Sequence, residues 1–150
     1  MNPIETALDE LREALTTFVG LLVRENEALQ DVHAEELSEV VAEKAHWSQT
    51  SNTAWNRLVI ASGIDTGRGE SLEGALAEQP DLLEKWKTIR KLVEAAEQLN
   101  HGNSVLIEAQ MRRTRQALDV LQSASNRGSL YGANGLMIES YQSRHTLDKV

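Results

Sequence analysis

The sequence predicts an all-α protein, an elongated antiparallel helical bundle with an irregular C-terminal tail. Only six of its 150 residues are aromatic, so the core must come from Leu, Val, Ile and Ala, a composition that favours helix seams over sandwiches or barrels. Leucines recur every seven residues near the N-terminus, and Pro3 and Pro80 are the only prolines. The three long helices are expected at about 3–30, 33–62 and 80–125, and a short helix near 71–78.

The first predicted helix carries the most regular heptad pattern. One heptad position holds Leu8, Leu15, Leu22 and Leu29, and the complementary position holds Ile4, Leu11 and Phe18. Pro3 suits the first turn of a helix, where its missing N–H costs nothing. At 1.5 Å per residue this helix is about 40 Å long.

The second predicted helix has a weaker seam, because Lys44 and Ser51 fall at positions where an apolar residue is expected. Asp31 is expected to cap its N-terminus. Its end is predicted at Ser62-Gly63, where three glycines within seven residues begin a loop.

The third predicted helix opens at Pro80 and reaches about Ser125, some 65 Å. One of its heptad positions holds Leu82, Ile89, Ala96, Asn103, Gln110, Ala117 and Ala124, and the other holds Trp86, Val93, Asn100, Ile107, Thr114 and Leu121. A helix so much longer than its two partners is expected to extend past them and leave apolar surface for a binding partner. Four polar residues interrupt the middle of this seam: Asn100, Asn103, Gln110 and Thr114. Two interpretations are equally supported: buried amides that fix the register of the helices, or a stretch that faces solvent.

The last 25 residues break the helical pattern. Glycines at 128, 132 and 135 oppose a helix, while Leu130, Tyr131, Leu136, Met137, Ile138 and Tyr141 are too apolar for a solvated tail. Residues 1–125 are therefore predicted to form one helical bundle domain, and residues 126–150 a flexible interaction tail.

Charge and composition exclude several classes of function. Residues 1–50 hold eleven acids against three bases, and the single basic cluster, Arg112, Arg113 and Arg115, lies beside Glu108 and Asp119. Nucleic acid is therefore not an expected partner. No cysteine, basic apolar leader or apolar run of about 20 residues occurs, so we expect a cytoplasmic protein without membrane insertion.

The sequence offers no recognisable catalytic, cofactor or metal motif, and we expect no enzyme. Its four histidines are scattered, and the acidic residues of the second helix (Glu35, Glu36, Glu39 and Glu43) lack the Glu-x-x-His pairing of di-iron bundles. The glycine clusters Gly67-Arg68-Gly69 and Gly132-Ala133-Asn134-Gly135 are not followed by the Lys-Ser/Thr pair of a phosphate loop. A polypeptide is thus the expected partner.

Three motifs in order resemble the FlgN-type flagellar export chaperones. They are Leu99-Asn100-His101-Gly102-Asn103-Ser104-Val105-Leu106-Ile107-Glu108, Gln116-Ala117-Leu118-Asp119-Val120-Leu121 and Leu130-Tyr131-Gly132-Ala133-Asn134-Gly135. They are similar to that family's asparagine-rich helix, its Ala-Leu-x-x-Leu helix end and its Leu-Tyr-Gly tail. The resemblance extends from about 81 to 138.

This resemblance implies a cytosolic chaperone that binds the C-terminal helices of the hook-filament junction proteins FlgK and FlgL. Such a chaperone prevents their premature assembly and delivers them to the type III export gate. On this hypothesis the client-binding residues are Leu118, Leu121, Leu130 and Leu136, the export-gate contact is Tyr131, and the register or family motif is Asn100, Asn103, Leu106 and Ile107. The alternative is a coiled-coil scaffold or adaptor that homodimerises through its first helix.

Overall fold

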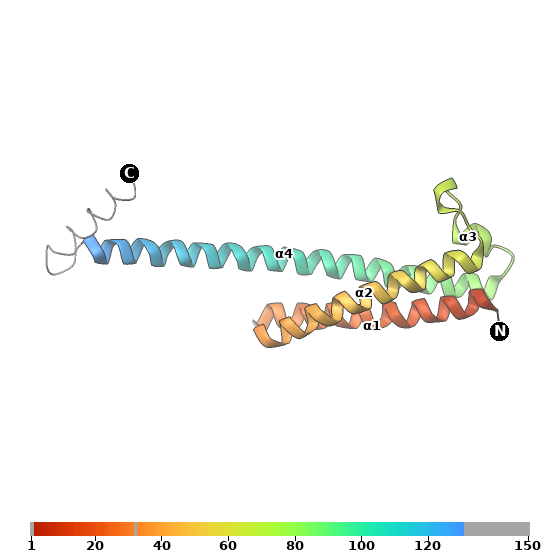
Figure 1. Ribbon diagram of the computed structural model, residues 1–150, viewed down its shortest axis with the longest axis horizontal. Helices are drawn as coiled ribbons and strands as arrows, with labels where there is room; N and C mark the ends of the chain where they lie inside the picture. Colours follow the sequence, from red (N-terminus) through yellow and green to blue (C-terminus); the bar gives the residue numbers. More distant parts are fainter. Residues whose placement is uncertain (1, 32, 131–150) are drawn as a thin grey trace. The chain divides into compact units, whose positions relative to one another are not determined.

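The computed structural model describes residues 2–31 and 33–130, and the chain divides into two compact units, Met1–Ile107 and Glu108–Val150. Its elements, in order, are α1 (Pro3–Asp31), α2 (Ala34–Ser62), the 3-10 turn η1 (Thr66–Arg68), α3 (Leu72–Ala75) and α4 (Pro80–Leu130) (Figure 1). No strand occurs among the described residues. The predicted all-α bundle is therefore confirmed.

Helix α1 begins at Pro3, as the sequence predicts, and Asn2 caps it. The Asn2 side-chain oxygen accepts a hydrogen bond from the backbone N–H of Ile4 at 3.0 Å. The four leucines of the predicted heptad position, Leu8, Leu15, Leu22 and Leu29, are all buried. The seam read from the sequence is thus the face that α1 turns to the core.

Helix α2 begins differently from the prediction and ends as predicted. Asp31 is the last residue of α1, and the N-cap of α2 is His33, which makes no side-chain cap hydrogen bond. The prediction that Asp31 caps α2 is therefore wrong. At the other end, Gly63 takes a left-handed backbone with φ 69° and donates its N–H to the carbonyls of Val59 and Ile60.

The connection from α2 to α4 contains η1 and one turn of helix, α3, within the predicted range 71–78. The Ser71 hydroxyl accepts from the backbone N–H of Gly74 at 3.2 Å and caps α3. Leu72 and Leu76 are buried in the main apolar cluster. This connection therefore closes one end of the core.

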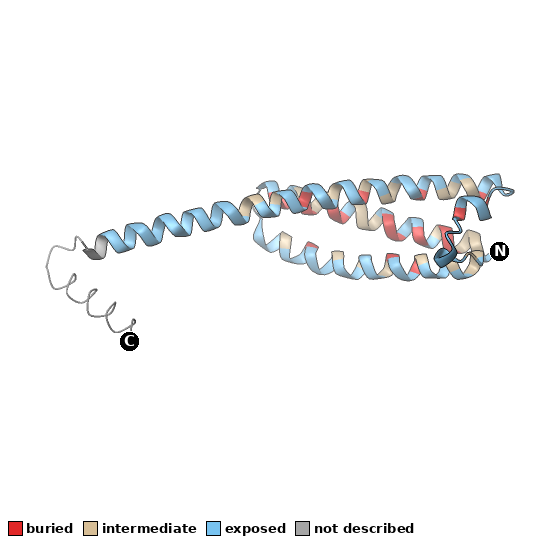
Figure 2. Cartoon of the chain, turned by 90° about the horizontal axis from the view of Figure 1, so that it is seen from above, coloured by how far each residue is buried: buried red, intermediate tan, exposed pale blue. Residues whose placement is uncertain are grey.

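The core of the first unit lies between the inward faces of α1, α2 and α4 (Figure 2). Its buried members are Ala7, Leu8, Leu11, Leu15, Ala54, Leu58, Leu72, Leu76, Leu82 and Ile89. At about 25 cal/mol per Å² of apolar surface, burial of such leucines is the main stabilising term of the bundle. We call residues 1–107 the bundle unit.

Helix α4 has 51 residues, against 29 each for α1 and α2. It continues through Gly128 to Leu130, five residues past the predicted end. Its buried residues, Leu82, Ile89, Ala96 and Asn103, occupy one of the two predicted heptad positions. We call residues 108–130 the C-terminal α4 segment. Residues 131–150 lie outside the described part of the chain, so the predicted domain boundary at 125/126 stays a prediction.

Candidate functional site

The most unusual side chain of the bundle unit is Asn103 of α4, which is only 1% exposed. Its amide nitrogen donates to the Leu22 carbonyl at 2.9 Å and to Glu25 Oε1 at 2.8 Å. Its amide oxygen accepts from Asn26 Nδ2 at 3.0 Å. Both donors and one acceptor site of the amide are therefore used, as burial requires.

Glu25 of α1 is the charged centre of this cluster, and it is 2% exposed. Besides the bond from Asn103, its carboxylate accepts from Lys44 Nζ of α2 at 3.2 and 3.4 Å. A buried carboxylate is tolerated only when a countercharge and hydrogen bonds replace its lost water. Lys44 and Asn103 supply both.

The cluster extends to the surface on two sides. Lys44 Nζ also donates to Asn100 Oδ1 at 2.8 Å, and Gln30 Nε2 donates to Asn26 Oδ1 at 2.8 Å. We call the set the polar network; its members are Asn26, Gln30, Glu25, Lys44, Asn100 and Asn103. It joins all three long helices, and no buried side-chain N or O atom in the described chain lacks a hydrogen bond.

The contacts of Asn103 oppose a shift of α4 along α1. A slip of α4 by one turn would move Asn103 about 5.4 Å and leave the Glu25 carboxylate without that donor. Leaving a buried charged acceptor unsatisfied costs about 1–3 kcal/mol or more, whereas an all-apolar seam penalises such a slip less. Asn103 is therefore a buried amide and not part of a solvent-facing stretch, while its role in fixing register stays a prediction; Asn100 and Thr114 are exposed, and Gln110 is half-buried.

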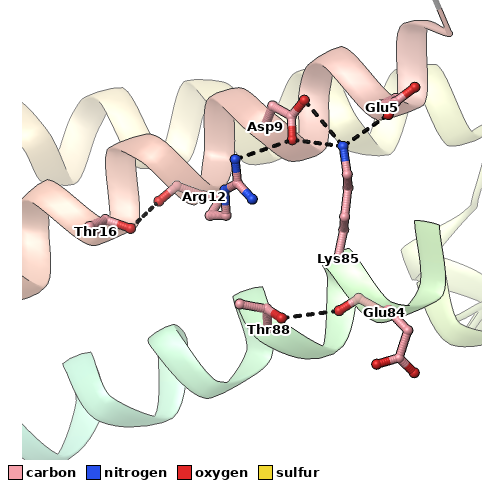
Figure 3. A network of polar contacts seen from close by, with 7 residues as sticks. All are labelled: Glu5, Asp9, Arg12, Thr16, Glu84, Lys85 and Thr88. Carbon is pink, nitrogen blue, oxygen red and sulfur yellow. Dashed lines mark hydrogen bonds and ion pairs between the residues drawn. The ribbon is translucent and has the colours of Figure 1, made fainter. Parts of the chain in front are cut away.

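A second charged cluster joins α4 to α1 near the other end of the bundle (Figure 3). Lys85 Nζ donates to Glu5 Oε1 at 2.9 Å and to Asp9 Oδ1 at 3.1 Å. These hydrogen bonds, that to Glu5 first and that to Asp9 second, raise the pKa of Lys85 above its usual value of 10.5. Arg12 shares the Asp9 carboxylate at 3.7 Å.

Between the two charged clusters lies an apolar pocket of about 350 Å³, lined by Leu11, Leu15, Ser51, Asn52, Trp55, Trp86 and Val93. The rings of Trp55 and Trp86 stack with centroids 5.8 Å apart. The Ser51 hydroxyl donates a hydrogen bond to the Trp47 carbonyl at 2.8 Å. The lining contains no titratable side chain, so the pocket can hold an apolar group but offers no acid or base.

Two leucines of the predicted client-binding set have exposed side chains. Leu118 is 52% exposed and Leu121 is 64% exposed, both in the C-terminal α4 segment. Leu130 ends α4, while Tyr131 and Leu136 lie outside the described residues. Their assignments stay predictions.

The predicted family-motif residues divide between two environments. Asn103 is buried and Asn100 reaches Lys44 from the surface, so both belong to the polar network. Leu106 is half-buried and Ile107 is 38% exposed, and neither belongs to that network. The two asparagines therefore contribute polar contacts between helices, whereas Leu106 and Ile107 contribute none.

The sequence did not predict the ion pairs that Glu25, Lys44 and Lys85 make between helices. One signal was present: Lys44 occupies a heptad position where an apolar residue is expected, and such an exception calls for a buried countercharge. The partner could not be named, because Glu25 lies 19 residues away on another helix. Heptad periodicity does not specify which turns of two helices face each other.

Two findings concern the chemistry open to the described residues. Within 2–31 and 33–130, His, Asp and Glu side chains do not gather into any group of three that could hold a metal ion. None of the helices in that part of the chain combines the length and apolarity needed to cross a membrane.

The fold and the polar network define a small all-α bundle protein whose third long helix makes buried polar contacts with the first. Within that class the chain belongs to the FlgN family, because the family model described as "FlgN protein" matches residues 1–138. The resemblance read from the three sequence motifs is thereby confirmed.

Curated relatives agree with this assignment. The flagella synthesis protein FlgN of Salmonella typhimurium is 25% identical over 130 residues, which cover 87% of this chain and 89% of the relative. The flagella synthesis protein FlgN of Escherichia coli K12 is 36% identical over 59 residues, 39% of this chain and 42% of the relative. No solved structure matches the chain.

Proposed function

We propose that this protein is a cytoplasmic flagellar export chaperone. In this role it binds the C-terminal helices of hook-filament junction proteins of the FlgK and FlgL type, keeps them from assembling early and delivers them to the type III export gate. The observation that carries the proposal is the FlgN family match over residues 1–138, together with curated relatives named flagella synthesis proteins.

The physical task of such a chaperone suits the C-terminal α4 segment. An assembly-competent helix released early exposes an apolar stripe, which a second helix can cover by packing its own apolar side chains against it. Leu118 and Leu121 lie three residues apart on one face of α4 and are more than half exposed. We assign client binding to these two leucines with Leu130 and Leu136, and contact with the export gate to Tyr131.

We propose a binding protein and not an enzyme. The charged side chains of the polar network are engaged by one another: Glu25 accepts from Lys44 and Asn103, and Lys44 also donates to Asn100. Groups held in this way support a structure, and the apolar pocket beside Trp55 and Trp86 lacks an acid or base.

The competing role, a scaffold that homodimerises through α1, needs an apolar seam on the outside of that helix. Leu8, Leu15 and Leu22 are instead buried within a single chain, and the first two pack with Leu58 of α2 and Ile89 of α4 in one cluster. A homodimer along this seam would require the bundle to open. The chaperone proposal requires no such opening.

The test is the affinity of the intact chain for the isolated C-terminal segment of a junction protein, measured by calorimetry. Leu118→Ala combined with Leu121→Ala should weaken binding at least tenfold, because about 1.4 kcal/mol of lost apolar contact corresponds to that factor. The matched control is Ile60→Ala, since Ile60 is 79% exposed on the bundle unit and should leave the affinity unchanged.

Unchanged affinity in the double variant would move the client site off this face. Tyr131→Ala tests the division of roles separately: export measured in cells should fall while client affinity stays the same. Equal loss of export and affinity would refute a separate gate contact.

A further inference from the structure

A hollow of about 640 Å³ lies between α1 and α2 and shares no residue with the apolar pocket beside Trp55 and Trp86. Ala14 of α1 and Ala54 of α2 line it, and they are only 3% and 5% exposed. Their small side chains leave space between the larger residues around them. We call this hollow the α1–α2 groove.

The lone cation of the groove and its threonine protons are already used. Arg57 Nη1 of α2 donates to Glu10 Oε2 of α1 at 3.1 Å. The hydroxyls of Thr50 and Thr53 donate to backbone carbonyls one turn earlier in α2, at 3.0 and 3.1 Å. Each threonine oxygen therefore keeps only its capacity to accept a hydrogen bond.

Glu13 is the free charge of the groove. Its side chain lines the groove from α1, it is exposed, and it has no cationic partner in the described chain. With the Thr50 and Thr53 oxygens it gives the groove a set of unused acceptors. A ligand that fits this set must bring donors.

Trp47 adds an aromatic wall to the groove. It is half-buried, and the ring of His46 meets it edge-on with centroids 5.5 Å apart. The face of an indole ring attracts a cation. Among side chains, the guanidinium of arginine combines five N–H donors with a planar surface that stacks on aromatic rings.

The charge around the groove favours the same kind of ligand. The bundle unit carries nineteen acids against nine bases. Eight of those nine bases already have a carboxylate within 4.0 Å. The unbalanced acids create a negative potential that attracts a basic segment and repels an anion.

We propose that the α1–α2 groove binds an arginine side chain of a basic polypeptide segment. In this complex the guanidinium donates to the Glu13 carboxylate and packs against Trp47, and the threonine oxygens are further acceptors. The inference goes beyond the proposed function, because it gives the bundle unit a partner of its own. That partner is recognised by charge, whereas the client is recognised by an apolar stripe on α4.

The experiment is an NMR titration of the full ¹⁵N-labelled chain at 0.15 M salt. The probes are synthetic Gly-Ser peptides that carry three arginines, three lysines or three glutamines. The arginine peptide should bind at least about threefold tighter than the lysine peptide, and the glutamine peptide should cause no shift. The indole N–H signal of Trp47 should move during the titration, while those of Trp55 and Trp86 stay in place.

Two variants with the same loss of charge locate the site. Glu13→Gln should raise the Kd of the arginine peptide about threefold to fivefold, the range of an exposed ion pair worth up to about 1 kcal/mol. Glu27→Gln is the control, because Glu27 is also exposed on α1 but does not line the groove. It lies about 21 Å farther along the helix, beyond the Debye length of about 8 Å, and its loss should leave the Kd unchanged.

Three results would overturn the inference: equal shifts with the arginine and glutamine peptides, binding that leaves the Trp47 signal in place, or equal weakening by Glu13→Gln and Glu27→Gln. The last would show attraction to the overall charge of the bundle unit only. Glu13→Gln should bind a junction-protein segment as the wild type does. A weaker client in this variant would make the groove part of the client site and refute a separate partner.

Discussion

The bundle unit and the C-terminal α4 segment use the same residue types for different purposes. In the bundle unit leucines are buried and nearly every cation has a carboxylate partner. In residues 108–127 leucines are more than half exposed, and the arginines have no carboxylate partner in the described chain. The arrangement in the bundle unit stabilises the fold, and that in residues 108–127 leaves apolar and charged groups available for another molecule.

The contrast is sharpest for leucine, so one substitution made in both regions should give opposite results. Leu22 is fully buried and Leu121 is 64% exposed. Leu22→Ala should lower the free energy of unfolding by about 2–5 kcal/mol, because it removes buried methyl groups and leaves a cavity. Leu121→Ala should change it by no more than about 0.5 kcal/mol.

Urea denaturation followed by circular dichroism measures both values. A comparable loss in the two variants would mean that Leu121 is covered in the free protein, and the contrast between the regions would disappear.

The next largest effect concerns ion pairs within the bundle unit, where the burial of a pair and not its charge determines how much stability its removal costs. Lys44 pairs with Glu25, whose side chain is 3% exposed, whereas Arg24 pairs with Glu43, half exposed, across the same two helices. Lys44→Met should cost toward the lower end of roughly 3–5 kcal/mol, since it leaves a buried carboxylate without its countercharge. Arg24→Met should cost about 0–1 kcal/mol.

Thermal unfolding of both variants at pH 7 makes this comparison. The double variant Lys44→Met with Glu25→Gln should recover part of the loss, because it removes the orphaned charge. No recovery would show that the loss does not come from the orphaned charge of Glu25.

The sequence was sufficient for the elements and insufficient for their alignment. Heptad spacing identified the buried faces of α1 and α4, and Gly63 and Pro80 marked an end and a start, because these signals are local to one helix. Asn103 was ambiguous, since its partners Leu22 and Glu25 lie 81 and 78 residues away. Lys44 looked like a weakness of the α2 seam for the same reason, because its partner Glu25 lies 19 residues away on α1.

The end of α4 shows a second limit of local reasoning. Gly128 has a low helix propensity, which placed the predicted end near residue 125, yet the helix reaches Leu130. A single glycine costs about 1 kcal/mol, less than a long helix can absorb near its end. Leu118 and Leu121 are exposed, and their assignment to client binding stays a prediction.

The smallest expected effect is the pH dependence at Lys85. Its hydrogen bonds to Glu5 and Asp9 raise its pKa in the folded protein above 10.5. A raised folded-state pKa stabilises the fold as long as lysine is protonated in both states, so the contribution is complete below pH 10.5 and disappears as the pH rises through the folded-state value. The stability difference between wild type and Lys85→Met should therefore be constant from pH 7 to 9 and shrink above 10.5.

Lys91→Met is the matched control on the same helix, because Lys91 has no carboxylate partner in the described chain, and its stability difference from wild type should not vary with pH in this way. Parallel curves for the two variants above pH 10.5 would show that Lys85 does not tie α4 to α1 through its charge.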